Sequence, residues 1–462
     1  MLLTLGILLA VCPAYCSNYF YVAPDGNDAN DGSIDHPFKT ITKAVDMVAA
    51  GDTIYLRGGR HYYSAKISLS KVGTSSAKYN LIAYPGERPI LDFSAMAYDS
   101  TNRGVSLSGQ YWYIKGLDIY KAGDNGMNIS GSNNIIEFCA FYENCDTGLQ
   151  LGGGAANNRI INCDSYYNYD YNTTPDPGGN ADGFSPKLDV GTGNYFYGCR
   201  SWQNSDDGYD GYLSTADDVN TTYENCWCFK NGYLKDGSPI LTGNGNGFKM
   251  GGSTAKDKRH NVIYKNCLSF NNRVKGFDQN NDKGSITLYN CTSFSNGTNN
   301  YSINLALASG KTATVTNCVS AGTGAVILLI TVVQTTNSWM SPPFGVNNAD
   351  FVSIDPNAAY GPRNADGSLP HIAFMHLATG SDLIDGGTDV GLPYNGSAPD
   401  LGAFEYIEGD CQPDGFIDFL DLRCLAANWL NSSCGTCNGA DFDGDSKVDF
   451  YDFAIMAENW ME

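Results

Sequence analysis

The sequence predicts an all-β fold: a parallel β-helix solenoid with a short helix capping its N-terminal end and a small α-helical unit at its C-terminal end. Three observations support this prediction. They are a repeated cysteine-containing string, a series of Gly-aromatic steps between those strings, and a duplicated Asp-rich segment near the C-terminus. The predicted organisation is a signal peptide at 1–16, a solenoid domain at 17–407 and the small unit at 408–462.

The cysteine repeat gives the coil period of the solenoid. The strings are EFCAFYEN, INCDSYYN, YGCRSWQN, ENCWCFKN, KNCLSFNN, YNCTSFSN and TNCVSAGT, with cysteines at 139, 163, 199, 226, 267, 291 and 318. The intervals are 24, 36, 27, 41, 24 and 27 residues, a period near 24 with two insertions. Disulfides are the alternative, but one equivalent cysteine per coil favours free thiols stacked in the core, with the Asn residues beside them forming ladders at the turns.

The two ends of the solenoid have their own signals. Helical spacing before Gly51 predicts a short amphipathic helix that closes the N-terminal end, with apolar positions Phe38, Ile41, Ala44, Val45 and Val48. Residues 340–407 lose the cysteine period, and we expect them to form an irregular coil packed on the other end. The run AVILLITVV at 325–333 is short of the roughly 20 residues of a membrane helix and predicts a buried strand.

The N-terminal segment and the net charge limit the class of protein to which this chain can belong. The apolar run at 3–11, followed by Ala14-Tyr15-Cys16, predicts cleavage after Cys16 and secretion. A formal charge of −21 repels nucleic acid, and no other run is long enough to cross a membrane. We therefore expect a secreted protein with neither a nucleic-acid partner nor a membrane span.

The Gly-aromatic steps place charged residues in register. They are TGLQ (147–150), DGFS (182–185), DGYD (207–210), NGFK (246–249) and KGFD (275–278). Equivalent positions on successive parallel strands stack about 4.8 Å apart, so Asp182 should lie beside Asp207, and Asp210 beside Lys249. With Asp206, four carboxylates and one ammonium meet on one patch, where we expect the side chains after the aromatic to point to solvent.

This patch has the composition of a calcium site. Ca²⁺ binds six to eight hard oxygen ligands, and clustered Asp residues supply several of them. A single Asp-Gly step usually forms a turn on the solvent-exposed surface, and a single Lys is usually a surface charge. Four Asp residues in register with a Lys favour the site.

The strings ADGFSPKLDVGTGN, SWQNSDDGYDGY, GNGFKMGG and KGFDQNN resemble polysaccharide lyase family 9, the calcium-dependent pectate lyases and their relatives. The resemblance covers roughly residues 18–405 and implies a right-handed parallel β-helix. By the family's pattern, Asp182, Asp206, Asp207 and Asp210 match the calcium ligands, and Lys249 matches the Brønsted base.

The resemblance implies β-elimination on an acidic, plant-type uronic-acid polysaccharide, in which the base removes the C5 proton. Polygalacturonate is the first candidate substrate and rhamnogalacturonan the alternative. Calcium bridging protein and substrate carboxylates would reconcile an acidic protein with an acidic polymer. Arg273 and Lys275, one coil further on, are predicted to meet neighbouring substrate carboxylates.

The C-terminal unit contains two matching twelve-residue loops, DCQPDGFIDFLD at 410–421 and DFDGDSKVDFYD at 441–452, each followed by an apolar helix. Oxygen side chains at positions 1, 3, 5, 9 and 12 predict calcium ligands. These are Asp410, Gln412, Asp414, Asp418 and Asp421 in the first loop, and Asp441, Asp443, Asp445, Asp449 and Asp452 in the second. The unit resembles a dockerin, which implies a cohesin-like partner. A calcium-stabilised tail without a partner is the alternative. Disulfides among Cys411, Cys424, Cys434 and Cys437 would staple it.

Three other functions remain open from the sequence. A polygalacturonase-like hydrolase would need an acid and a base carboxylate but no base Lys. A C5-epimerase would share the proton abstraction without the elimination. A non-catalytic carbohydrate-binding solenoid would use calcium only structurally.

Overall fold

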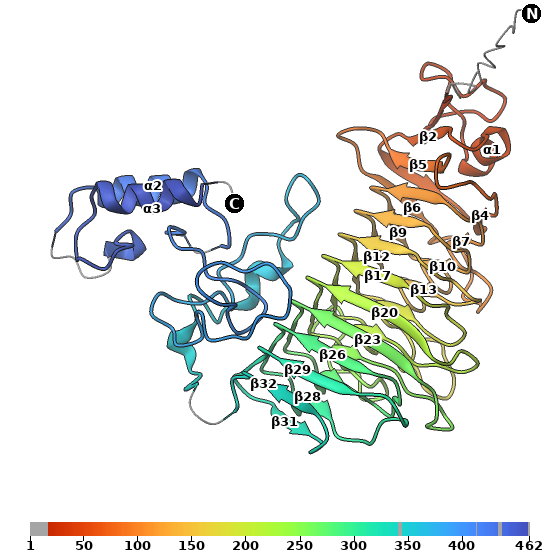
Figure 1. Cartoon of the computed structure of the whole chain (residues 1–462). Helices are drawn as coiled ribbons and strands as arrows, with labels where there is room; N and C mark the ends of the chain where they lie inside the picture. The colour runs from red at the N-terminus through yellow and green to blue at the C-terminus, as the bar shows by residue number, and fades with distance from the viewer. Residues whose placement is uncertain (1–16, 341–343, 413, 433–436, 461–462) are drawn as a thin grey trace, which may run out of the picture.

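The computed structural model describes residues 17–340, 344–412, 414–432 and 437–460, so the predicted signal peptide lies outside the described residues. A solenoid of parallel strands occupies most of the chain, and a two-helix unit follows it (Figure 1). The predicted fold class of the main domain is confirmed.

Three parallel sheets run the length of the solenoid, and each complete coil adds one strand to each sheet, while β1 and β32 extend one sheet at its two ends. Sheet A contains β1 (Tyr19–Val22), β2 (Thr53–Leu56), β5 (Tyr79–Ala83), β8 (Trp112–Lys115), β11 (Ile135–Glu137), β14 (Arg159–Ile161), β17 (Asn194–Tyr197), β20 (Val219–Glu224), β23 (His260–Lys265), β26 (Ile286–Tyr289), β29 (Ala313–Thr316) and β32 (Val333–Thr335). Sheet B contains β3 (Gly59–Tyr62), β6 (Pro89–Asp92), β9 (Asp118–Tyr120), β12 (Ala140–Tyr142), β15 (Asp164–Tyr166), β18 (Arg200–Trp202), β21 (Trp227–Phe229), β24 (Leu268–Phe270), β27 (Thr292–Phe294) and β30 (Val319–Ala321). Sheet C contains β4 (Ile67–Leu69), β7 (Val105–Leu107), β10 (Met127–Ile129), β13 (Leu149–Leu151), β16 (Phe184–Pro186), β19 (Tyr209–Asp210), β22 (Phe248–Lys249), β25 (Lys275–Asp278), β28 (Asn299–Ile303) and β31 (Ala325–Leu328).

The repeated cysteines are free thiols in the core, as predicted. All seven are buried between sheets A and B, and each lies just before a strand of sheet B. Their Sγ atoms donate to backbone carbonyls two residues earlier, as Cys163 does to Ile161 at 3.3 Å. The residue before each cysteine adopts a left-handed conformation, as at Asn162 (φ 51°) and Asn266 (φ 50°). Asn tolerates this region better than most residues, which explains the recurring Asn-Cys pair.

The Asn residue that ends six of the repeated strings forms the predicted ladder. Each side-chain amide donates to the next Asn Oδ1 along the solenoid, for example Asn204 to Asn231 and Asn231 to Asn272, both at 3.0 Å. The ladder contains Asn144, Asn168, Asn204, Asn231, Asn272 and Asn296, all buried. The ladder provides hydrogen-bond partners for the side-chain amides and backbone N–H groups of this buried turn.

The N-terminal end is capped as predicted, by α1 (Ile41–Met47). Thr40 is its N-cap and accepts a hydrogen bond from the Lys43 backbone at 3.1 Å. Ile41, Ala44 and Val45 are buried in the main core cluster, so the helix closes the first coil (Figure 1).

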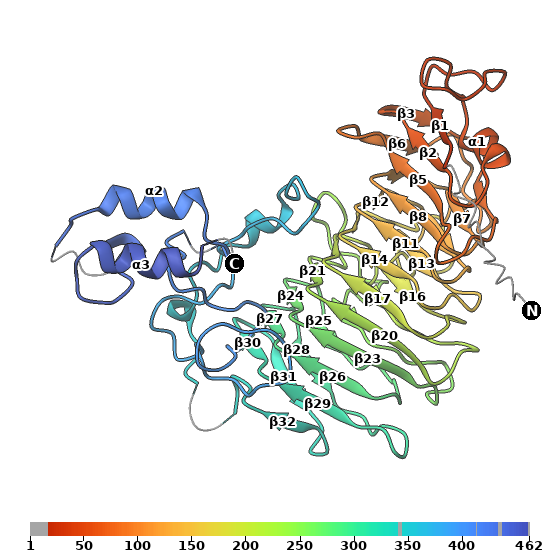
Figure 2. The ribbon, with the colours of Figure 1, turned by 45° about the horizontal axis from the view of Figure 1, so that its top comes forward.

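The segment after residue 343 does not pack on the C-terminal end, so that prediction is wrong. It lies along the outer face of sheet B, where Figure 2 shows it beside β24, β27 and β30. The reason is that the outer face of the late strands of sheet B carries large apolar side chains: the outward rings of Trp202, Phe229 and Phe270 stack on one another. Phe374 covers Phe270 with ring centroids 4.8 Å apart.

A buried ion pair network fixes this segment. Arg200 Nη2 and Arg363 Nη2 lie 2.8 and 2.7 Å from the two Asp164 carboxylate oxygens. Burial would raise the pKa of Asp164, but the two guanidinium groups lower it to about 2. The segment contains the short 3₁₀ turns η1 (Asn348–Asp350) and η2 (Pro356–Tyr360).

The apolar run 325–333 forms strands of the last coil, but it is not buried as predicted. Ile327, Ile330 and Val333 are 45%, 96% and 55% exposed. The segment that was expected to cover this end packs on sheet B instead, which leaves the last coil with solvent on its outer side.

The C-terminal unit consists of α2 (Phe419–Asn428) and α3 (Phe450–Glu458), which lie side by side, and the turn η3 (Cys437–Gly439). A small core of its own includes Ile417, Leu425, Val448 and Met456. A disulfide joins Cys411 to Cys424, and Cys437 is also disulfide-bonded, while Cys434 lies outside the described residues. Within the described part of the chain, no helix is long and apolar enough to cross a bilayer.

The Asn ladder predicts a large loss of stability from one substitution. Asn231→Ala should lower the free energy of unfolding by about 2 kcal/mol or more, because it orphans buried groups on two neighbouring coils. Urea denaturation followed by circular dichroism measures this. The matched control is Asn27→Ala, which removes an exposed hydrogen bond to Ala29 and should change stability by less than about 0.5 kcal/mol. Equal effects of the two substitutions would contradict a structural ladder.

Candidate active site and metal centre

The Gly-aromatic steps occupy equivalent positions on β13, β16, β19, β22 and β25, as the alignment predicted. Leu149 pairs with Phe184, Phe184 with Tyr209, and Tyr209 with Phe248, which pairs with Phe277. The aromatic rings stack in the core with centroids 4.7 to 5.3 Å apart. This stack holds the backbone that carries the neighbouring charged residues.

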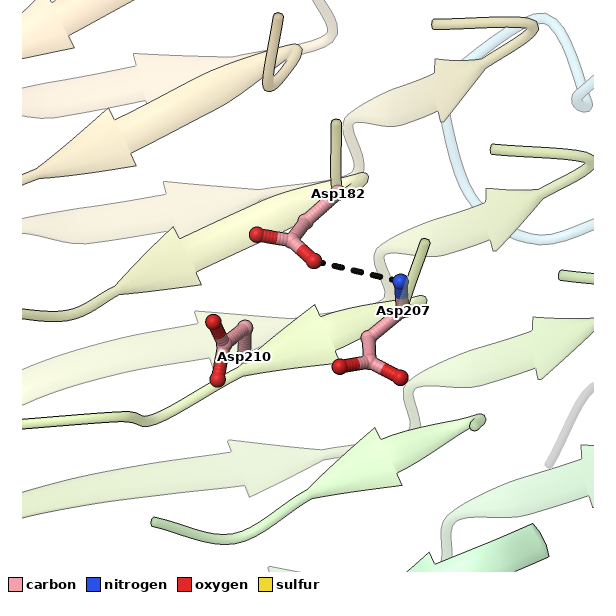
Figure 3. Close-up of side chains that lie close together, drawn as sticks. All are labelled: Asp182, Asp207 and Asp210. Atoms are coloured by element: carbon pink, nitrogen blue, oxygen red, sulfur yellow. Dashed lines mark hydrogen bonds between the residues drawn. The ribbon is translucent and has the colours of Figure 1, made fainter. Parts of the chain in front are cut away.

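The predicted neighbours meet in space. The Asp207 backbone N–H donates to Asp182 Oδ1 at 3.1 Å (Figure 3), and Asp210 and Lys249 are ladder partners. Carboxylate oxygens of Asp182, Asp207 and Asp210 all lie within 4.8 Å of one another. Asp206 lines the same cleft, and its Oδ1 accepts a hydrogen bond from the Asn244 backbone.

These side chains are not on an open face, so the expectation of solvent exposure is wrong. Asp210 and Lys249, which follow the aromatic residues, are only 4% and 8% exposed, and Asp182 and Asp207 are fully buried. The two longest intervals of the cysteine repeat explain the enclosure. Residues 167–183 and 230–247 form long connections from sheet B to sheet C, whereas 203–208 makes the short connection between them.

The two long connections contact each other and wall the cleft. Thr242 Oγ1 donates to the Pro177 carbonyl at 2.5 Å, and Gly179, Asn180 and Asn244 line the cleft itself. The cleft has a volume of about 410 Å³, within the range of small-ligand sites. The enclosure lowers the local dielectric, which strengthens every charge interaction inside.

Two lysines share the carboxylates. Lys249 Nζ lies 3.0 Å from Asp207 Oδ2 and 3.4 Å from Asp210 Oδ1. Lys187 Nζ lies 2.7 Å from Asp182 Oδ2 and 3.7 Å from Asp210 Oδ2. Sequence reasoning missed Lys187, although it stands within ADGFSPKLDVGTGN. It follows the end of β16, outside the aligned steps, so register did not single it out.

The pKa values show carboxylates crowded together. Burial raises the pKa of Asp207 to about 7 despite Lys249, and burial together with Asp207 raises the pKa of Asp206 well above its usual range. Burial would raise the pKa of Asp210 too, but Lys249 and Lys187 lower it. Burial would lower the pKa of Lys249, but Asp207 and Asp210 raise it well above the ordinary value. Without a further cation, the site holds Lys249 as an ammonium.

The residues present fit Ca²⁺. The ligand set is all oxygen, which this hard cation prefers. Asp207 Oδ2 is buried and receives no hydrogen bond, even though Lys249 lies within ion-pair distance. An unsatisfied buried carboxylate oxygen beside two others is the arrangement that a bound cation would stabilise.

Arg273 and Lys275, the predicted substrate contacts, have protein partners and are not among the residues that line the cleft. Arg273 Nη2 donates to the carbonyls of Gly243 and Asn244, so it supports the second wall. Lys275 Nζ lies 2.8 Å from Asp278 Oδ1. Their role toward a substrate stays a prediction.

The cleft extends from the Asp cluster toward the N-terminal coils, in a direction that the sequence did not predict. Its lining there includes Arg103, Asp124 and Gln150, and Arg103 Nε lies 3.3 Å from Asp124 Oδ2. Arg103 stands two residues before Val105, as Asp182 stands two residues before Phe184. Val105 lies two coils before Leu149, the first of the aligned steps, so the alignment did not reach this position.

In the C-terminal unit, the second loop gathers Asp441, Asp443 and Asp452 with oxygens within 4.8 Å of one another. Asp418 and Asp449 serve as N-caps of α2 and α3, where Asp421 and Asp452 complete capping boxes.

In the first loop, Asp410 Oδ2 accepts hydrogen bonds from the backbone N–H groups of Asp414 and Gly415, and Asp421 Oδ1 accepts one from the Gln412 backbone N–H. Two predicted ligands also have side-chain partners: Asp414 Oδ2 lies 3.3 Å from His371 Nδ1, and Asp445 Oδ2 lies 2.8 Å from Lys447 Nζ.

Comparison with known proteins agrees with this geometry. Residues 20–317 match the family model described as Pel9A-like, right handed beta helix region. Pectate lyase L of Dickeya dadantii is 38% identical over 84% of this chain and 90% of its own length. Pectate lyase L of Paenibacillus polymyxa is 40% identical over 80% of this chain and 84% of its own.

Two solved structures share the solenoid. The crystal structure of pectate lyase Pel9A superposes with a TM-score of 0.77 at 37% identity, covering 84% of this chain and 96% of that one. A rhamnogalacturonan lyase superposes with a TM-score of 0.69 at 28% identity, covering 79% and 97%. The chain therefore belongs to the Pel9A-like family of right-handed parallel β-helix proteins.

Proposed function

We propose that this protein is a calcium-dependent lyase that cleaves polygalacturonate by β-elimination, with Lys249 as the base. The observation that carries the proposal is one enclosed cleft in which Lys249 contacts two carboxylates of an all-oxygen cluster. The pectate lyases among its relatives support the choice of polymer.

Lys249 would accept the C5 proton of a uronate. The electron pair of the C5–H bond then forms the C4–C5 double bond, the C4–O4 bond breaks, and the leaving O4 takes a proton from water. Asp182, Asp206, Asp207 and Asp210 would hold Ca²⁺, whose positive charge stabilises the negative charge that develops on the substrate carboxylate. Asp207 and Asp210 favour the Lys249 ammonium only while their own charge is not neutralised by another cation.

Two cationic side chains of the cleft, Lys249 and Arg103, support an acidic polysaccharide as the substrate. The connections 167–183 and 230–247 enclose the Asp cluster, and Arg103, which is paired with Asp124 at the other end of the cleft, would bind a second carboxylate of the polymer. Rhamnogalacturonan is the second candidate substrate, favoured by the rhamnogalacturonan lyase that shares the solenoid.

Ultraviolet absorbance of the unsaturated uronate tests the reaction directly. Wild-type protein with Ca²⁺ should produce the absorbance on polygalacturonate, and a chelator should abolish it. Lys249→Ala should lower kcat by at least about 10²-fold, because it removes a positioned base. Lys115→Ala, which removes a surface lysine paired with Glu137, is the matched control and should keep full activity.

Rhamnogalacturonan in the same assay separates the two substrates. A rise in absorbance on rhamnogalacturonan alone would show that rhamnogalacturonan, and not polygalacturonate, is the substrate. Absence of any rise on both polymers, or full activity of Lys249→Ala, would reject the lyase proposal in favour of a hydrolase, an epimerase or a carbohydrate-binding solenoid.

We also propose that residues 408–462 form a dockerin-like unit that binds calcium and docks to a cohesin-like protein. Support comes from the duplicated loop and helix and from the Asp441, Asp443 and Asp452 cluster. The apolar run at 3–11, together with an extracellular polymer as substrate, supports secretion after cleavage behind Cys16.

Calcium titration of the full chain tests the second loop. Asp441→Asn combined with Asp452→Asn should remove one bound Ca²⁺ equivalent in calorimetry and leave lyase activity unchanged, because these residues lie outside the cleft. Asp217→Asn, at a surface carboxylate paired with Arg259, should leave the stoichiometry intact. An unchanged stoichiometry in the double variant would contradict a calcium site in this loop. Binding of a cohesin to the wild-type protein only when Ca²⁺ is present would support the partner.

A further inference from the structure

We propose that Lys187 is a positioning residue that sets the charge of the cation site and so its preference for a divalent ion. This inference rests on the proposed calcium function of the cleft. Lys187 lines the same cleft as Lys249 and Asp210, and its side chain is only 6% exposed.

Lys187 fixes which oxygen of Asp182 faces the cluster. Asp182 Oδ2 lies 2.7 Å from Lys187 Nζ, accepts from Ser185 Oγ at 2.7 Å, and lies 3.3 Å from Thr147 Oγ1. Asp182 Oδ1 accepts the Asp207 N–H at 3.1 Å. Three side chains therefore commit Oδ2 to the protein, which leaves Oδ1 as the oxygen of Asp182 that can serve a cation.

The backbone holds Lys187 rigidly in this place. Its N–H donates to the Leu151 carbonyl at 3.1 Å on the preceding coil. Leu188, the next residue, adopts a left-handed conformation (φ 64°) and bridges to Leu213 on the following coil. The side chain therefore leaves a backbone that is tied to two coils, and its ammonium reaches Asp182 and Asp210 without a flexible loop.

The effect of Lys187 on the site follows from these contacts. Its ammonium brings one positive charge to the carboxylates that would hold the cation, 2.7 Å from Asp182 Oδ2 and 3.7 Å from Asp210 Oδ2. A neutral residue at 187 would make the site more negative by one unit charge. This change favours a trivalent over a divalent cation, because the Coulomb energy grows with the charge of the ion.

Competition between Tb³⁺ and Ca²⁺ for the cleft measures this preference without reference to activity. Sites in the full chain are assigned to the cleft when Asp207→Asn abolishes them, which separates them from the C-terminal loops. Lys187→Met should raise the ratio of Tb³⁺ to Ca²⁺ affinity at least about tenfold, since one unit charge at contact distance exceeds the 1.4 kcal/mol that a factor of ten represents. Lys187→Gln, which keeps a hydrogen-bond donor without the charge, should show the same rise.

Two control variants leave the charge of the cleft unchanged. Lys187→Arg retains the positive charge in the cleft, and Lys115→Met removes a lysine outside it, so both should keep the wild-type ratio. A wild-type ratio in both Lys187→Met and Lys187→Gln, with circular dichroism showing a folded chain, would overturn the role of Lys187. Failure of the wild-type cleft to bind Ca²⁺ at all would instead reject the proposed function on which the inference rests.

Discussion

The parallel register between successive coils is the constraint on which the site depends. Hydrogen bonds between neighbouring strands of sheet C stack equivalent residues about 4.8 Å apart, and the buried rings of Phe184, Tyr209 and Phe248 prevent slippage. This spacing brings carboxylates from different coils close enough to share a cation. A shift by one residue would turn the charged side chains into the core and the aromatic rings outward.

Such a concentration of like charge is costly, and the fold compensates for it locally. The Asp cluster lies under two long connections, 167–183 and 230–247, that remove it from water. Buried carboxylates then need partners, which Lys187, Lys249 and backbone N–H groups supply in part. The oxygen of Asp207 that still lacks a hydrogen bond marks where a cation completes the site. The Asn and cysteine ladders supply the rigid frame that withstands this repulsion.

Much of this could be predicted from the sequence, because a repeat fixes local structure coil by coil. The free cysteines, the Asn ladder, the capping helix and the pairings of Asp182 with Asp207 and Asp210 with Lys249 all follow from period and register. Features that depend on residues outside the repeat could not be predicted. The burial of the Asp cluster depends on how the insertions fold, the position of residues 344–407 depends on outward rings such as Trp202, and Lys187 lies beyond the aligned steps.

The most direct test of the account is the position of the cation itself. Anomalous scattering from a crystal of the full chain grown with Ca²⁺ would locate it. The account predicts a peak in the cleft at a calcium–oxygen distance of about 2.3 to 2.6 Å from carboxylate oxygens of Asp182, Asp206, Asp207 and Asp210. A cleft without a peak, in a crystal whose C-terminal loops hold Ca²⁺, would contradict a calcium-dependent active site.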